Sequence, residues 1–486
     1  MLRPDLTGRL GAVAAAHPLA VAAGTRLLQE GGTAVDAAIA AQAVLCVVMP
    51  NACGLGGDGL WLIADPDGLV TAVNGTGASP AADPPGRRAH DAGASVTVPG
   101  LVDAWATVTR RWGSRPLADT LAPAIALAAD GVAADGELVA AARAHRGRLL
   151  RGGAAGWPVV AADRRGARLR QPALAAALEA VARTDGAELY RGALAEGIAR
   201  AVQRDGGAME PSDLAAHTTV VADPIGVPWR GGTAWVQPPM SQGVLLAMAL
   251  NWLEGHDTPV DDDHREHVLV ELTEAVFGHR DRAGLGAVLL REPLDVDRER
   301  AAGRGGPRAY LHTAGVAVAD REGRVVSSLL SVFDDFGSAT FVPEGGFTLN
   351  NRAGGFTQAP NDPAPGKRPV HTLAPALLTG ADGLTAIATP GADGQVQTLL
   401  QVLARSVTGP DDLPAAIAAP RWRSEGGSLL VEASHPLRDE LAARGHCVTL
   451  LPDGADRFGA VVCAGVRDGW PVAAGDWRRQ VWAGAA

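Results

Sequence analysis

The chain is helical in pattern over much of its first half and rich in strand patterns toward its end. Helically spaced, alanine-rich apolar positions dominate residues 11–48 and predict helices over 20–29 and 34–48, with Thr33 as the cap of the second. Residues 100–210 show the same spacing, interrupted by Pro and Gly, and are expected to be mainly helical.

Strand patterns come in runs of their own. Apolar stretches at 60–64 and 68–73 and β-type residues over 220–236 predict strands in the first half. Residues 313–332 predict a hairpin that turns at 321–324. Strands are also expected at 372–379, 384–389, 428–432, 447–451 and 459–466, with helices at 244–253, 394–406 and 411–418. Helices and strands in separate runs favour a layered α+β fold over alternating βαβ units.

Composition excludes several classes of partner. The formal net charge is -10, and acidic residues and arginines are interleaved without a basic run, so neither nucleic acid nor an anionic membrane surface is expected to bind. The chain shows no apolar span of 18 residues and no start typical of a signal peptide. Its four cysteines lack CxxC spacing, which favours reduced thiols and a cytoplasmic location.

The sequence also gives no reason to expect a cofactor. The twelve histidines show no paired spacing typical of metal ligands, so no metal site is expected. The glycine run at 54–59 lacks the Lys-Ser/Thr ending of a phosphate loop and the GxGxxG spacing of a dinucleotide site. Nucleotide binding is therefore a remote alternative.

Short motifs follow one another through the first 243 residues in a recognisable order. They are GGTAVDAA at 31–38, GLGG at 54–57, PG at 99–100 before WG at 112–113, DLA at 213–215 before WRG at 229–231, and PPMSQG at 238–243. Each motif alone is weak. Together, in this order, they resemble the γ-glutamyltransferase family.

A second series of motifs lies after residue 312 at nearly the spacing of that family. A Thr-led strand pattern occupies 313–320, followed by a turn glycine at 323, FGS at 336–338, LNN at 349–351, KRP at 367–369 and PG at 390–391. The resemblance thus covers most of the chain. It implies an α+β fold of the N-terminal-nucleophile hydrolase type, a four-layer αββα sandwich.

The resemblance also implies a precursor that cuts itself between His312 and Thr313. Residues 1–312 would form a large piece and 313–486 a small one, and the two would stay associated as one intertwined unit. The stretch 292–309 is rich in Arg, Gly and Pro, and we interpret it as an exposed, mobile connector that lets the new terminus move away. A homodimer of this heterodimer is left open.

Chemistry explains why a threonine at a new N-terminus matters. A threonine hydroxyl is a weak nucleophile that needs a base beside it. An α-amino group, with an ordinary pKa near 8, supplies that base on the same residue at neutral pH. Before the cut, the same hydroxyl can attack the carbonyl group of His312. Without the flanking motifs, Thr313 would be taken for an ordinary strand residue.

Other candidate catalytic groups surround this threonine in the predicted hairpin and beyond it. Ser331 on the second strand can hydrogen-bond Thr313, or it is a strand serine that faces solvent. The backbone N–H groups of Gly391 and Ala392, at a strand-to-helix turn, can form an oxyanion hole, or the turn holds no ligand. Asn350 and Asn351 are either turn residues or hydrogen-bonding groups of the substrate pocket.

The chain departs from the family where the family grips an amino acid. Thr76 stands in place of an arginine that binds the substrate carboxylate, and Gly355 in place of an aspartate that binds its amino group. His371 and Thr372 replace a pair of serines, Phe333 replaces an asparagine, and Ala314 replaces a second threonine. The pattern resembles a divergent branch that includes cytoplasmic γ-glutamyl hydrolase-like proteins and oxamate amidohydrolase.

These departures lead to a specific hypothesis about substrate binding. Arg352, His371 and Thr372, with Thr76 and Asn351, would form a rebuilt pocket in which Arg352 holds a small anionic acyl amide. Alternatively, Arg352 is a surface arginine. The expected activity is hydrolysis of a γ-glutamyl or related small acyl amide through an acyl-enzyme, with water as the acceptor. The competing hypothesis is an uncleaved, non-catalytic relative that keeps the fold for binding.

Overall fold

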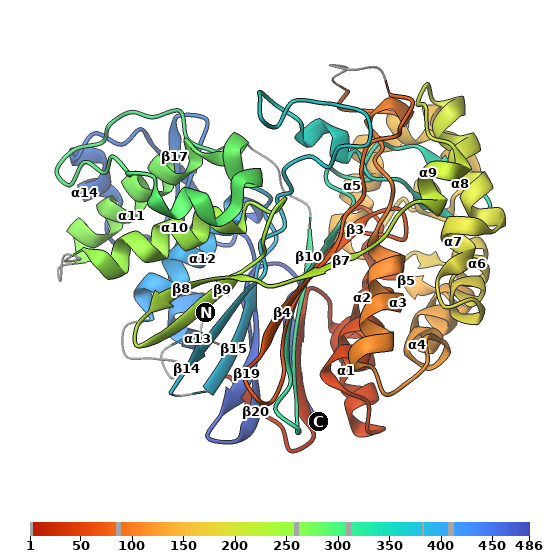
Figure 1. Cartoon of the computed structure of the whole chain (residues 1–486), viewed down its shortest axis with the longest axis horizontal. Helices are drawn as coiled ribbons and strands as arrows, with labels where there is room; N and C mark the ends of the chain where they lie inside the picture. Colours follow the sequence, from red (N-terminus) through yellow and green to blue (C-terminus); the bar gives the residue numbers. More distant parts are fainter. Residues whose placement is uncertain (1–2, 84–88, 257–261, 308–312, 382, 407–412) are drawn as a thin grey trace.

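Two seven-stranded antiparallel sheets lie next to each other in the middle of the molecule, with a group of helices outside each (Figure 1). The computed structural model describes residues 3–83, 89–256, 262–307, 313–381, 383–406 and 413–486. The protein is thus of mixed α/β type with antiparallel sheets.

The first sheet carries the predicted hairpin at its centre. Its strand order is β21 (Trp482–Ala485), β2 (Gly11–Ala15), β10 (Ala314–Asp320), β11 (Val325–Ser331), β3 (Asp58–Ala64), β4 (Val70–Gly75) and β7 (Val220–Ala222). The second sheet has the order β1 (Leu6–Thr7), β20 (Trp470–Gly475), β19 (Val462–Arg467), β15 (Gly383–Ala388), β14 (Ala376–Gly380), β9 (Gly232–Val236) and β8 (Ile225–Trp229). Strands from before and after Thr313 therefore pair within both sheets.

The facing sides of the two sheets form one buried cluster of mostly small residues. Ala317 and Ala319 of β10 pack there with Ala386 and Ala388 of β15. Alternate residues of β10, such as Val316, point the other way into the core beneath the helices. Both faces of β10 are therefore buried, which explains its nearly continuous apolar sequence.

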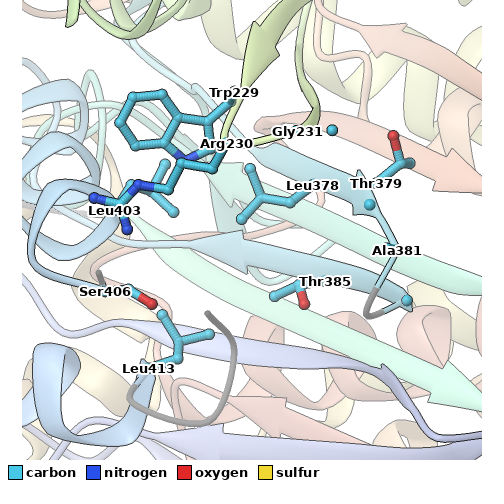
Figure 2. Close-up of a pocket in the computed structure, with 13 residues that line it drawn as sticks. Trp229, Arg230, Gly231, Leu378, Thr379, Ala381, Thr385, Leu403, Ser406 and Leu413 are labelled. Carbon is cyan, nitrogen blue, oxygen red and sulfur yellow. The ribbon is translucent and has the colours of Figure 1, made fainter. Parts of the chain in front are cut away.

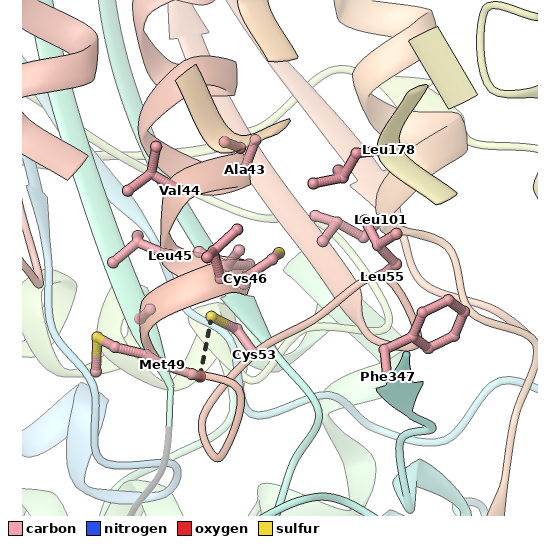
Figure 3. Close-up of a cluster of buried hydrophobic side chains, with 14 of the residues drawn as sticks. Ala43, Val44, Leu45, Cys46, Met49, Cys53, Leu55, Leu101, Leu178 and Phe347 are labelled. Atoms are coloured by element: carbon pink, nitrogen blue, oxygen red, sulfur yellow. Dashed lines mark hydrogen bonds between the residues drawn. The ribbon is translucent and has the colours of Figure 1, made fainter. Parts of the chain in front are cut away.

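Helices α1 (Pro18–Gln29) and α2 (Ala34–Val48) cover the outer face of the first sheet. Thr33 caps α2 through a capping box in which the Asp36 side chain accepts from the Thr33 N–H. Figure 3 shows the end of α2 in this core, where the Cys53 Sγ lies 3.7 Å from the Met49 carbonyl oxygen. Helices α3 (Leu101–Trp112), α4 (Leu117–Asp130), α5 (Gly136–Arg151), α6 (Pro172–Arg183), α7 (Ala187–Arg191), α8 (Ala193–Arg204) and α9 (Pro211–Ala215) follow.

A second group of helices covers the other sheet. Residues of α10 (Gly243–Gly255) and α12 (Gly394–Arg405) pack against β9, β14 and β15 in a separate apolar cluster. Around them lie α11 (Asp262–Phe277), α13 (Leu413–Ala418), α14 (Arg438–Ala443) and a small sheet of β16 (Trp422–Glu425), β17 (Ser428–Glu432) and β18 (Val448–Leu451). Two short hairpins pair β5 (Val132–Ala133) with β6 (Arg168–Leu169) and β12 (Phe341–Val342) with β13 (Phe347–Thr348).

Most of the predicted elements are confirmed, including both early helices, the Thr33 cap and the hairpin after residue 313. The helical interpretation of 11–48 is wrong at its start, because Gly11–Ala15 is strand β2 between β10 and β21. All five residues of β2 are buried, and their small size suits a strand packed on both faces. Residues 292–307 form no helix or strand and are mostly exposed, as expected of a connector.

Candidate active site

Two hydroxyl groups meet at the end of the central hairpin. Thr313 comes directly before β10, and the pairing of Ala314 with Leu330 puts it opposite Ser331, the last residue of β11. Thr313 Oγ1 lies 3.4 Å from Ser331 Oγ, and Ser331 Oγ also accepts a hydrogen bond from the Phe333 N–H at 2.9 Å. Both side chains are buried. Ser331 is thus placed to orient the hydroxyl of Thr313.

Asp58 lies beside this pair of hydroxyl groups, on the next strand of the sheet. The register of β11 with β3 pairs Ser331 with Asp58, so Thr313, Ser331 and Asp58 stand side by side on three adjacent strands. The Asp58 carboxylate is fully buried and lies 3.2 Å from His371 Nε2. It also lies 3.5 Å from Arg352 Nε. An anionic group therefore sits one strand away from the hydroxyl pair, with a cation beside it.

Arg352 is fully buried, so its interpretation as a surface arginine is wrong. Its guanidinium lies 4.3 Å from the centre of the Phe333 ring, and its Nη1 lies 3.3 Å from Thr372 Oγ1. Within the described part of the chain, Arg352 Nε and Nη2 and Asp58 Oδ1 have no hydrogen-bond partner. Buried polar atoms are rarely left in this state. They are therefore candidates for binding a ligand.

Burial sets the charge of this cluster. It lowers the pKa of His371 to about 4, with a further lowering from Arg352 that the Asp58 carboxylate opposes. His371 is thus neutral at neutral pH. Burial also lowers the pKa of Arg352 to about 10 against the attraction of Asp58, which leaves the guanidinium charged at neutral pH.

The turn before α12 also lies near Thr313. Pro390 and Thr313 line one cavity of about 10 Å³, which is roughly the space of a single water molecule. Gly391 has a φ of 127° and Ala392 a φ of 47°. Among the described residues, the N–H groups of Gly391 and Ala392 donate no hydrogen bond. The turn can thus offer two backbone donors near the hydroxyl of Thr313.

Gln242, at the start of α10, connects the turn to the charged cluster, by which we mean Asp58, Arg352 and His371. Its Nε2 donates to the Ala392 carbonyl oxygen at 3.0 Å and to the Thr372 carbonyl oxygen at 2.8 Å. Contacts therefore lead from Thr313 through Ser331 and Phe333 to Arg352, and from there through Thr372 and Gln242 to Ala392. We call these seven residues the active-site ring: Thr313, Ser331, Phe333, Arg352, Thr372, Gln242 and Ala392.

Three residues of this region were not singled out by sequence reasoning. Asp58 stands inside the glycine run, where a lone carboxylate between two glycines was the available signal. Asp393 is fully buried at the cap of α12, and its Oδ1 lies 3.3 Å from Nε of the buried Arg280. Nothing in the sequence around Arg280 indicated that it would come to the turn.

Some predicted pocket residues have structural partners instead. Thr76 Oγ1 donates to Asn74 Oδ1 at 2.7 Å, and no hydrogen bond between described residues connects it to the active-site ring. Asn351 Nδ2 donates to the His90 carbonyl oxygen at 3.0 Å, and its Oδ1 accepts from the Asp334 N–H. Asn350 Oδ1 accepts from the Arg352 N–H at 3.0 Å. The two asparagines thus hold the backbone around Arg352.

His312, half of the predicted cleavage site, lies outside the described residues. Among the residues that are described, no group of three or more His, Cys, Asp or Glu side chains is arranged to hold a metal ion. No helix in the same part of the chain is long and apolar enough to cross a membrane.

A larger cavity of about 220 Å³ lies away from this site (Figure 2). Trp229 at the end of β8 and Arg230 in the turn after it border the cavity together with Thr385 of β15 and Ser406 after α12. None of its described lining residues belongs to the active-site ring. The size of a cavity therefore does not identify the site in this molecule, whereas the convergence of hydroxyl, amide and charged groups does.

Comparison with known proteins agrees with this geometry. The sequence pattern of the family described as Gamma-glutamyltranspeptidase matches residues 20–286 and 296–485. The chain is 32% identical to the oxamate amidohydrolase proenzyme of Klebsiella pneumoniae, over 92% of this chain and 93% of that protein. It is 33% identical to the glutathione hydrolase-like YwrD proenzyme of Bacillus subtilis, over 87% of this chain and 86% of that protein. The crystal structure of cephalosporin acylase from Bacillus halodurans superposes with a TM-score of 0.88 at 28% identity, covering 100% of this chain and 97% of that one.

Proposed function

The chain belongs to the gamma-glutamyltranspeptidase family, and on this premise we propose that it is a self-cleaving amide hydrolase with Thr313 as its nucleophile. The relatives it resembles are named as proenzymes that are hydrolases of amide bonds. The observation that carries the proposal is the position of the Thr313 hydroxyl, 3.4 Å from Ser331 Oγ and next to a turn whose two backbone N–H groups donate no hydrogen bond to any described residue.

Self-cleavage would begin with attack of Thr313 Oγ1 on the carbonyl carbon of His312. The peptide bond to Thr313 breaks, its nitrogen takes up a proton, and water then hydrolyses the ester that forms. The products are 1–312 and 313–486. Since strands of both pieces pair within both sheets, the pieces would remain associated. With helices outside each sheet, we assign the αββα sandwich of N-terminal-nucleophile hydrolases to the fold.

Turnover would use the new N-terminus. The α-amino group of Thr313 accepts the proton of the hydroxyl as Oγ1 attacks the substrate carbonyl carbon. The N–H groups of Gly391 and Ala392 would stabilise the oxyanion. Collapse expels the amine, which takes the proton from the α-ammonium group. Water then attacks the acyl-enzyme by the same route and releases the acid and the free Thr313.

The acyl group would bind at Arg352, Thr372 and His371. The Nη2 atom of Arg352, which has no hydrogen-bond partner among the described residues, supports this assignment because it can donate to a carboxylate carried by the acyl group. Asp58 keeps the buried guanidinium charged and oriented. The substrate class is thus a small acyl amide with a carboxylate, of which γ-glutamyl amides and oxamate are examples. The cytoplasmic location inferred from the cysteines remains a prediction.

A substrate screen tests the proposal. The purified protein and Thr313→Ala would be incubated with γ-glutamyl-p-nitroanilide, glutaryl-p-nitroanilide and oxamate, and the release of nitroaniline or ammonia followed. We expect hydrolysis of at least one compound by the native protein and none by the variant. Equal rates for both proteins, or no hydrolysis of any compound by a fully cleaved protein, would count against the proposed activity.

A further inference from the structure

Two buried side chains from distant elements hold the turn that would form the oxyanion hole. Arg423 on β16 has its Nη1 3.4 Å from the Gly391 carbonyl oxygen and 3.0 Å from the Arg457 carbonyl oxygen. Gln242 holds the next carbonyl group, that of Ala392, at 3.0 Å. Both side chains are almost inaccessible to solvent. The carbonyl groups on either side of the Ala392 α-carbon are thus each anchored.

Anchoring a carbonyl group also aims an N–H group. In a trans peptide, C=O and the following N–H lie in one plane and point in opposite directions. The carbonyl of Gly391 shares its plane with the N–H of Ala392. Arg423, by binding that oxygen, therefore sets the direction of the Ala392 N–H. Gln242 fixes the following plane, so the conformation of Ala392 is constrained from both sides.

The backbone conformation that these contacts hold at Ala392 is unfavourable by itself. Ala392 has a φ of 47°, in the left-handed region that costs a residue with a side chain on the order of 1 kcal/mol or more. Surrounding contacts must maintain such a conformation. Arg423 and Gln242 make two of these contacts, and the Gly394 N–H makes another by donating to the Gly391 carbonyl oxygen at 2.7 Å.

The absence of a side chain at Gly394 allows the close approach of Arg423 to the turn. A Cβ at this position would lie 2.6 Å from Arg423 Nη1 and 3.0 Å from its Cζ, so the guanidinium packs against the bare α-carbon. Gly394 is the first residue of α12 and lies outside the left-handed region, so its backbone does not require glycine. Behind it, Arg423 Nε lies 2.8 Å from Glu425 Oε2, which keeps the guanidinium in place.

We propose that Arg423 and Gln242 are positioning residues that aim the Ala392 N–H at the oxyanion formed when Thr313 attacks its substrate. The inference rests on the proposed function. In that step Oγ1 bonds to the carbonyl carbon, its proton passes to the α-amino group, and the π electrons move to the carbonyl oxygen. The N–H of Ala392 binds this oxygen. In this role Arg423 and Gln242 act on the reacting atoms only through the Ala392 N–H, so their effect is on the rate of the step rather than on binding.

Gly394→Ala tests this directly, because it displaces the Arg423 guanidinium while leaving its charge in the protein. Alanine suits a helical position better than glycine, so no loss of stability is expected from the backbone. Gly147→Ala on α5, where an added Cβ meets only the exposed end of Arg151, is the matched control. Gln242→Leu removes the second contact. All variants would be assayed as self-cleaved protein with p-nitrophenyl acetate and γ-glutamyl-p-nitroanilide.

We expect Gly394→Ala and Gln242→Leu to lower kcat by about ten- to a hundredfold, with KM within about twofold, since loss of one oxyanion donor costs about 10²–10³ in kcat. Methylboronic acid, which forms a tetrahedral adduct with a hydroxyl nucleophile, should lose affinity in proportion to kcat/KM. A purely structural role would instead lower the fraction of active protein and leave kcat per active site unchanged.

The outcomes separate this inference from the proposed function. If native protein hydrolyses p-nitrophenyl acetate faster than Thr313→Ala but both positioning variants keep the native kcat and boronate affinity, the positioning role is wrong and the nucleophile stands. If the native protein is no faster than Thr313→Ala, the proposed function fails and the positioning role falls with it.

Discussion

The hydroxyl pair of Thr313 and Ser331 and the charged cluster of Asp58, Arg352 and His371 are neighbours in the structure, yet they are held in opposite ways. The hydroxyl pair carries no charge, and its members are 18 residues apart on one hairpin. The charged cluster is fully or almost fully buried, and Asp58 and His371 are 313 residues apart.

This difference determines how much stability a substitution in each group costs. Removing the hydroxyl group of Thr313 or Ser331 leaves a small cavity and no uncompensated charge. Removing one charge from the cluster leaves its partner buried without compensation, which is strongly destabilising. We therefore expect substitutions in the hydroxyl pair to affect rate at little cost in stability, whereas substitutions in the charged cluster affect the stability of the fold as well.

Asp58→Asn should have the largest effect. It leaves the Arg352 guanidinium buried without its carboxylate, so the free energy of unfolding should fall by about 3–5 kcal/mol. Urea denaturation of the purified protein measures this. The control is the double variant Asp58→Asn with Arg352→Met, which removes both charges and should recover most of the loss. A single variant as stable as the native protein would show that the pair is not energetically coupled.

Arg352→Lys should come next and should separate binding of the acyl group from chemistry. Lysine keeps the charge but not the planar donors, so kcat/KM for γ-glutamyl-p-nitroanilide should fall about a hundredfold. Hydrolysis of p-nitrophenyl acetate, whose acyl group carries no carboxylate, is the internal control and should change by less than about threefold. Equal losses on both substrates would contradict a role for Arg352 in recognising the acyl group.

The buried histidine of the cluster should make stability depend on pH. The pKa of His371 is about 4 in the folded protein and near 6.5 in the unfolded chain. Between these values the unfolded state binds more protons, so His371 favours folding fully above pH 6.5 and loses this contribution as the pH falls toward 4. From pH 7 to pH 5 the loss is about 2 kcal/mol for this one residue.

Comparison of the native protein with His371→Gln isolates this contribution, because other histidines, among them His217 and His435, also have a pKa lowered to about 4 by burial. The unfolding free energy of His371→Gln should fall less between pH 7 and pH 5 than that of the native protein, by the same amount of about 2 kcal/mol. Parallel pH curves for the two proteins would mean that His371 is not buried in its neutral form.

Ser331→Ala should have the smallest effect on stability and a moderate effect on rate. Loss of the hydroxyl that orients Thr313 should lower kcat about tenfold, while the free energy of unfolding should change by about 1 kcal/mol. Ser327→Ala is a matched control, since Ser327 lies four residues from Ser331 along β11 and its Oγ donates to the Ile387 carbonyl oxygen at 3.0 Å. If both variants lose the same activity, Ser331 has no specific role.

The same contrast explains what could be predicted from the sequence. The hairpin of β10 and β11 depends on neighbours in the chain, so its strands, its turn and the meeting of Thr313 with Ser331 follow from a local pattern. The turn at Gly391 and Ala392 also follows from a local signal, a Pro-Gly before a helix.

The sequence predicted that Arg352 and His371 share a pocket but not that Asp58 joins them, since nothing near Asp58 or Arg280 in the sequence indicates their distant partners. The sequence left open whether Arg352 was buried, because burial of a charge depends on a partner brought in by the fold. Strand β2 was mistaken for helix for a related reason. Its alanines suit either element, and the two strands that flank it come from far along the chain.

The most direct test of the account is the intact mass of the freshly purified native protein and of Thr313→Ala, with N-terminal sequencing of any fragment. We expect two fragments from the native chain that meet between residues 312 and 313, with threonine at the new N-terminus, and a single intact chain from the variant. A native chain that stays whole on long incubation, or a variant that is cut at the same bond, would contradict Thr313 as the self-processing nucleophile.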